Sequence, residues 1–156
     1  GTAGAGRGAG VAGDVVAAKQ ARVREAGGLH GAALDDPLER LRRLGGQGLA
    51  AIAGAGLAAR IGRVPVILDG YACTAAAAAL YAIDEHALDD CIAGHCSAEP
   101  GHRRLRDAMG KRPVVELDMR LGEGSGGAIA LGVLRAAVAC HAGMATFEQA
   151  RVDGPA

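Results

Sequence analysis

The chain has 156 residues and equal numbers of basic and acidic side chains, so its formal net charge is zero. It therefore has no overall charge that would attract nucleic acid or an anionic membrane, and only three aromatic residues are available for stacking on bases. The length suits one domain, residues 1–156, with an aliphatic core. We expect no nucleic-acid partner and no membrane partner.

The four cysteines form no C-x-x-C pair, and they lie at Cys73, Cys91, Cys96 and Cys140. No secretory segment opens the chain, so free thiols in a cytoplasmic protein are expected. A zinc site that adds His95 and His102 to Cys91 and Cys96 would match no common ligand spacing. We expect no metal and no cofactor. The longest uncharged apolar run, 72–83, is too short to span a bilayer.

The N-terminal part predicts loops and helices. Its expected elements are a glycine-rich loop at 1–13 and helices at 14–25, 36–44 and 47–61. Asp14 is a suitable N-cap for the first helix, and Gly27-Gly28 is expected to end it. Asp36-Pro37 has the residue types of an N-cap and a first helical position. The chain also begins with Gly, so we expect either processing or a piece of a longer protein.

The remainder alternates strands and helices. Its expected strands are 64–69, 91–94 and 113–117, and its expected helices are 72–83, 101–109 and 127–143. The first strand is continuously apolar, which is typical of burial on both faces in a parallel sheet. Alternation of this kind predicts an α/β fold, a parallel Rossmann-like sheet with flanking helices, here as an incomplete domain.

Three loops are candidates for a ligand site, one near the N-terminus and two after expected strands. Loops that follow parallel strands gather at one edge of the sheet, where ligands bind. The first, at 6–10, combines Gly6, Gly8 and Gly10 with Lys19 on the helix that follows. Exposed backbone N–H groups with a lysine suit an anion. The loop matches neither a Walker A motif nor a dinucleotide fingerprint, and a flexible tail or a plain turn is the alternative.

The second loop, 94–101, leads to His102 and contains Ser97. A Ser-His or Cys-His nucleophile pair is conceivable, but no Gly-x-Ser-x-Gly elbow surrounds it. Ser97 is better suited to donate a hydrogen bond to a phosphate or a ribose. A turn that caps the next helix is an equally good interpretation.

The third loop, 121–127, sets Glu123 among four glycines before an apolar helix. Glycines around a single acid are typical of a ligand that lies close to the main chain. The alternative is a plain helix entry, in which Glu123 favours the N-terminal dipole.

Taken in order, five segments resemble one family along essentially the whole chain. They are DPLERLRRLGG at 36–46, PVILDG at 65–70, SAEPGH at 97–102, RLGEGSG at 120–126 and MATF at 144–147. The family is the nicotinate-nucleotide:dimethylbenzimidazole phosphoribosyltransferases, whose members are about twice as long. The resemblance implies that this chain is a C-terminal half. It also implies transfer of 5-phosphoribosyl from nicotinate mononucleotide to 5,6-dimethylbenzimidazole, which gives α-ribazole 5′-phosphate and nicotinate.

The resemblance also implies roles for single residues. Glu123 would be the general base, with Leu121 beside it in the substrate pocket. Phosphate would be held by Gly8, Lys19 and Ser97, with Gly6 and Gly10 shaping the loop. A full-length protein would be a homodimer.

Two residues depart from the family pattern: Gln47 and Gly48 replace an aromatic residue and a glutamate. The alternative function is that of a truncated, catalytically silent α/β module that binds a nucleotide or a partner.

Overall fold

A three-stranded parallel sheet forms the centre of the protein in a computed structural model that describes residues 13–152. The strands β1 (Val66–Leu68), β2 (Cys91–His95) and β3 (Pro113–Val115) lie side by side in that order, with Ile67 opposite Ile92 and Ala93 opposite Pro113. The carboxyl ends of all three strands therefore meet at one edge. The predicted fold class, a parallel α/β sheet with flanking helices, is confirmed.

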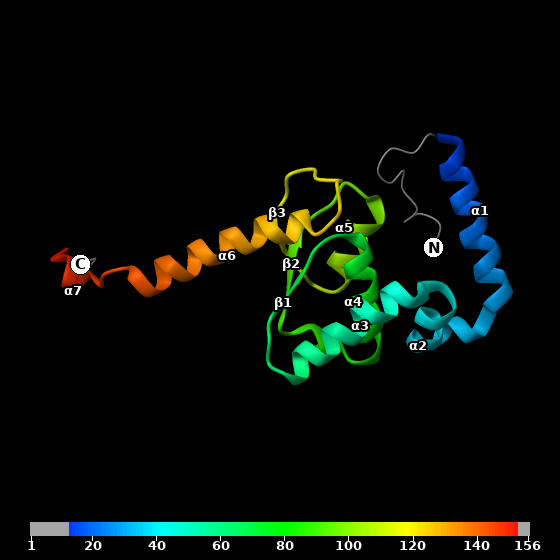
Figure 1. Ribbon diagram of the computed structural model, residues 1–156, viewed down its shortest axis with the longest axis horizontal. Helices are drawn as coiled ribbons and strands as arrows, with labels where there is room; N and C mark the ends of the chain where they lie inside the picture. Colours follow the sequence, from blue (N-terminus) through cyan, green and yellow to red (C-terminus); the bar gives the residue numbers. More distant parts are fainter. Residues whose placement is uncertain (1–12, 153–156) are drawn as a thin grey trace.

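Helices cover both faces of this sheet (Figure 1). On one side, α4 (Tyr71–Ile83) packs against α3 (Gly46–Ile61) and α5 (Pro100–Ala108), and α6 (Ser125–Gly143) crosses the strands on the other. The short η4 (Glu85–Leu88) leads from α4 to β2. The main aliphatic core joins β1, α4, η4 and the C-cap of α5 through Leu68, Ala77, Leu88 and Met109.

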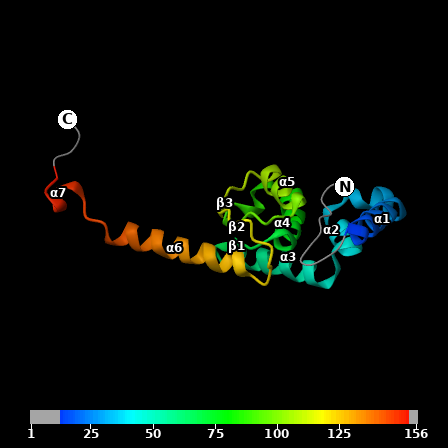
Figure 2. The same ribbon diagram turned by 90° about the horizontal axis from the view of Figure 1, so that it is seen from above.

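Two segments extend away from the sheet in opposite directions (Figures 1 and 2). At one end, α1 (Gly13–His30) reaches the rest of the chain through η2 (Gly31–Asp35), α2 (Pro37–Arg40) and η3 (Leu41–Gly45). At the other end, α6 continues past the strands toward α7 (Phe147–Ala150). Only Gly126 and Ala130 of α6 are buried, and both lie in its first two turns.

The expected end of the first helix is wrong. The helix α1 continues through Gly27-Gly28 to His30, and the chain turns at Gly31, which has a left-handed φ of 44°. A helical glycine costs about 1 kcal/mol relative to alanine but keeps its N–H donor, so two glycines weaken a helix without breaking it.

The expected start of the second helix is confirmed. Asp36 is its N-cap, and its carboxylate accepts hydrogen bonds from the backbone N–H groups of Leu38 at 2.8 Å and Glu39 at 3.3 Å. Proline at the first helical position lacks an N–H group that would have no helical partner in any case.

The expected length of the apolar segments also needs correction. The strands β1 and β3 are shorter than predicted, and α6 begins at Ser125, two residues early. At 19 residues, α6 is longer than the 72–83 run, and by length and composition it is the one helix among residues 13–152 that could cross a membrane. It carries Arg135 and packs its first turns against β2 and β3, as the core helix of an α/β domain does.

Candidate functional site

The candidate site lies at the carboxyl edge of the sheet, where the residues that follow each strand come together. Asp69 follows β1, and its Oδ1 accepts a hydrogen bond of 2.7 Å from the backbone N–H of Gly127 in the first turn of α6. These two residues are 58 positions apart in the sequence. This bond attaches the glycine-rich segment to the edge that the strands form.

A glycine in the first turn of α6 makes room for a histidine at the end of β2. A Cβ atom built on Gly126 would lie 2.0 Å from Cδ2 of His95, a distance that no side chain can tolerate. The ring of His95 is buried and packs edge-to-face with that of His102, with 5.9 Å between their centroids. Gly126 is thus required for the close approach of α6 to the sheet.

His95 forms few polar contacts for a buried imidazole. Its Nε2 lies 3.9 Å from Oδ1 of Asp69, which is too long for a hydrogen bond. Its Nδ1 is buried without a hydrogen-bond partner among residues 13–152. The sequence places Ser97 and His102 in one candidate loop and Asp69 at the end of the first expected strand. The meeting of Asp69, His95 and His102 was not predicted, because no local signal joins three distant segments.

His102 is the centre of a buried hydrogen-bond chain. Its Nδ1 lies 3.0 Å from the backbone N of Ser97 and 2.9 Å from Oγ of Ser97, while its Nε2 lies 3.0 Å from Oγ1 of Thr74. The Thr74 hydroxyl donates in turn to the carbonyl oxygen of Gly70 at 2.9 Å. Burial, then the neighbouring His95 and Arg106, lower the pKa of His102 to about 4, against the smaller opposing effect of Asp69. The ring is therefore neutral at pH 7.

Ser97 also lines a cavity of about 400 Å³ beyond the end of β2. The cavity combines opposite charges, Arg103 and Arg104 with Glu116 and Asp118. Arg103 pairs with Glu116 at 3.5 Å. The backbone N–H of Ala98 donates to the carbonyl oxygen of Met119 at 3.2 Å, which ties this loop to the segment after β3. Ser97 is thus half-buried between an open polar cavity and a buried imidazole.

Glu123 occupies a tight turn that precedes α6. It has a φ of 58° between Gly122 at 82° and Gly124 at 75°, three consecutive left-handed residues. A glutamate is strained in this conformation, whereas the flanking glycines adopt it freely. Backbone strain of this kind in a non-glycine residue is concentrated at functional sites. Glu123 is nevertheless exposed, and the side chain of Leu121 is 71% exposed, so the described residues enclose neither of them.

Lys19, another predicted site residue, is not brought to this edge. Lys19 is exposed on α1, which packs mainly on η2 and lies at the far end of the molecule from the start of α6 (Figures 1 and 2). Gly6, Gly8 and Gly10 lie outside the described residues, so the expected anion loop is not tested. Ser97 and the 121–127 segment do share the edge. Within residues 13–152, no group of three or more His, Cys, Asp or Glu side chains could hold a metal ion.

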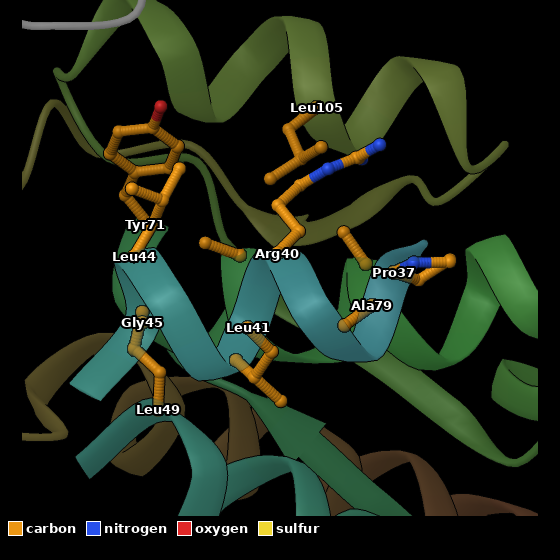
Figure 3. A pocket seen from close by; sticks show the side chains of 11 residues that line it. Pro37, Arg40, Leu41, Leu44, Gly45, Leu49, Tyr71, Ala79 and Leu105 are labelled. Carbon is orange, nitrogen blue, oxygen red and sulfur yellow. The ribbon is translucent and has the colours of Figure 1, made fainter. Parts of the chain in front are cut away.

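A second cavity, of about 390 Å³, lies between η3, α4 and α5. Figure 3 shows Tyr71 at one end and Pro37 at the other, with Leu41, Leu49 and Leu105 around the opening. Its one charged group, Arg40, donates from Nε and a terminal nitrogen to the carbonyl oxygen of Leu34. The lining offers apolar contact and no acid, so this cavity has no evident chemistry of its own.

Comparison with known proteins finds one family that matches nearly the whole chain. Residues 2–152 match a family model described as "Phosphoribosyltransferase". The chain is 55% identical over 149 residues to the nicotinate-nucleotide–dimethylbenzimidazole phosphoribosyltransferase of Brucella anthropi, and 58% identical over 149 residues to that of Rhizobium etli CFN 42. The match covers 96% of this chain and 44% of each relative, so the chain spans less than half of their length.

A solved structure is similar over nearly the whole chain. The crystal structure of CobT from Thermus thermophilus matches with a TM-score of 0.88 and 38% identity, over 97% of this chain and 45% of that one. The arrangement of sheet and helices therefore also occurs within a longer polypeptide.

Proposed function

Because this chain belongs to the phosphoribosyltransferase family, we propose that it forms part of an enzyme that transfers 5-phosphoribosyl from nicotinate mononucleotide to 5,6-dimethylbenzimidazole. The products are α-ribazole 5′-phosphate and nicotinate. The observation that carries the proposal is the identity of 55–58% to enzymes named for these two substrates, sustained over 96% of the chain. No metal or cofactor is part of the proposed reaction.

Glu123 is the proposed general base. One azole nitrogen attacks C1′ of the ribose, and the bond from C1′ to the pyridinium nitrogen breaks with its electron pair going to nicotinate. The other azole nitrogen then loses its proton to the carboxylate. The leaving ring needs no proton, since its nitrogen becomes neutral as the bond breaks. Attack opposite the leaving group inverts the anomeric carbon. A positioned base of this kind contributes about 10²–10⁴-fold in rate.

Ser97 is the proposed donor to the 5′-phosphate, because its hydroxyl is half-buried at the sheet edge that also holds Glu123's loop. Lys19 and the backbone of Gly6, Gly8 and Gly10 would add positive charge and N–H donors, and Leu121 would pack on the azole. Among the described residues α1 packs mainly on η2, so Lys19 would reach a phosphate at the sheet edge only if α1 moved.

A homodimer is the proposed assembly of the complete protein in the cytoplasm. Apolar side chains along α6 are exposed, including Leu131, Val133 and Val138. A helix of this composition needs a covering partner or a further part of its own chain.

The second candidate is a catalytically silent module that binds a nucleotide or a partner. The exposure of Glu123 and Leu121 favours it, since an open pocket provides no water-free environment for phosphoribosyl transfer. In this case the chain would retain the residues and the fold of the family but would not catalyse the transfer.

A chimera separates the two candidates. The matched 44% of the Brucella anthropi enzyme is replaced by this chain, and nicotinate release is followed with both substrates present. We expect release from the chimera and none, or almost none, from the chain alone. A folded chimera that binds nicotinate mononucleotide but releases no nicotinate would favour the silent module.

Lys19 is tested in the same chimera. Lys19→Ala should raise KM for nicotinate mononucleotide with little change in kcat, because it removes a phosphate contact that is made before and during the reaction. Arg22→Ala, which removes another exposed cation of α1, serves as the control.

A further inference from the structure

Ser97 lines the cavity and also contacts the buried His102. Its two hydrogen-bond donors share one acceptor atom of that histidine. Both its backbone N–H and its hydroxyl lie within 3.0 Å of Nδ1 of His102. An unprotonated imidazole nitrogen has only one lone pair. Two donors therefore share it.

The same contacts determine the tautomer of His102. A backbone N–H can only donate, so Nδ1 must be the acceptor and the proton must reside on Nε2. Nε2 then donates to Oγ1 of Thr74, whose own hydroxyl proton is directed to the carbonyl oxygen of Gly70. Each donor in this chain has an acceptor, and the ring cannot turn over without breaking three hydrogen bonds. Tyr71 stacks on the ring at 6.2 Å and restricts it further.

We propose that His102 is a positioning residue that presents the hydroxyl of Ser97 to the phosphate of the mononucleotide. The proposal rests on the proposed function and extends it to a residue that itself stays buried. When a phosphate oxygen accepts a hydrogen bond from the Ser97 hydroxyl, the backbone N–H of Ser97 still donates to Nδ1 of His102. The loop therefore does not need to rearrange. A ready-made donor of this kind reduces the entropic cost of binding.

Two substitutions distinguish positioning from simple core filling. In His102→Asn the side-chain oxygen lies near the place of Nδ1 and can still accept from Ser97. In His102→Gln the longer side chain can still donate to Thr74 but provides no acceptor close to Ser97. The dissociation constant of nicotinate mononucleotide is measured by calorimetry in the chimera, together with KM for the azole. We expect His102→Gln to weaken mononucleotide binding about tenfold, the effect of one lost hydrogen bond, and His102→Asn to weaken it clearly less.

A double-mutant cycle tests the coupling to Ser97. The variant Ser97→Ala/His102→Gln should bind the mononucleotide no more weakly than Ser97→Ala alone, because both changes act on the same hydroxyl. KM for the azole should be unchanged throughout. His86→Asn, at an exposed histidine of η4, is the matched control and should change neither constant. Additive losses in the cycle, or equal losses from Asn and Gln, would overturn the proposal.

Two further measurements keep the test decisive. If His102→Gln does not fold, Thr74→Val should weaken mononucleotide binding and Thr74→Ser should restore it; an unchanged affinity in Thr74→Val would contradict the proposal. Nitrogen-15 NMR of the full chain reports the tautomer without any need for activity. A proton on Nδ1 at pH 7 would refute the inference even if nicotinate release succeeds. A mononucleotide that binds as predicted without turnover would refute only the proposed function.

Discussion

Two neighbouring parts of the sheet edge differ in how completely this chain builds them. Around His102, every donor of the ring, of Thr74 and of Ser97 has an acceptor, and the residues come from α4, α5 and the loop after β2. Around Glu123, the backbone is strained and the side chains are exposed. The proposed phosphate side of the site is thus organised by this chain itself, whereas the proposed base needs further protein around it.

Loss of the base should produce the largest effect. Glu123→Gln in the chimera is expected to lower kcat by about 10²–10⁴-fold, because the amide cannot take the azole proton. The unfolding midpoint should not change, since Glu123 is exposed. Glu85→Gln, at an exposed acid of η4, is the control. A small change in kcat would show that the strained turn serves only as a helix entry.

A substitution at Gly126 tests whether the start of α6 packs closely against the buried His95. Gly126→Ala places a methyl group 2.0 Å from the ring of His95, and we expect a loss of about 3 kcal/mol of unfolding free energy. Gly132→Ala in the same helix meets nothing within 4 Å and should stabilise the protein by about 0.5–1 kcal/mol. Denaturant unfolding of the chain measures both. Similar values for the two variants would mean that α6 is not held against His95 in solution.

The unfolding free energy should also depend on pH through the buried His102. Burial, with His95 and Arg106 nearby and Asp69 opposing them, lowers the pKa of His102 from 6.5 to about 4. The unfolded chain thus binds more protons than the folded one between these values, and the unfolding free energy should fall as the pH drops from 6.5 toward 4. His102→Asn should flatten this dependence, and His86→Asn should leave it in place. An unchanged slope in His102→Asn would assign the pH dependence to other groups.

The smallest effect is expected at Gly48, one of the two residues that depart from the family pattern. Gly48 lies in α3 and an added Cβ would meet nothing within 4 Å. Gly48→Ala should therefore raise the unfolding free energy by about 0.5–1 kcal/mol without a change in nicotinate release. Thermal unfolding checks the first part. A decrease in stability would indicate that this surface of α3 is covered by something that requires glycine.

Local signals in the sequence accounted for much of the fold. Asp36-Pro37 predicted its helix start because an N-cap and its N–H partners are two or three residues apart. The continuous apolar strand at 64–69 predicted a parallel sheet because burial on both faces leaves no polar alternation. The end of α1 was mispredicted, since glycines lower helix stability only modestly and do not define a boundary.

The sequence by itself determined the order of strands and helices and, through five short motifs, the family, because these depend on residue types at short spacings. The proposed base follows from that family resemblance and stays a prediction. The tertiary structure alone decided that Asp69 reaches Gly127, that Gly126 makes room for His95, and that Ser97 shares Nδ1 of His102 with its own backbone. It also decided that Glu123 is exposed and that α1, which carries Lys19, packs mainly on η2. Contacts between distant segments arise from packing, and packing leaves no periodic pattern in a sequence.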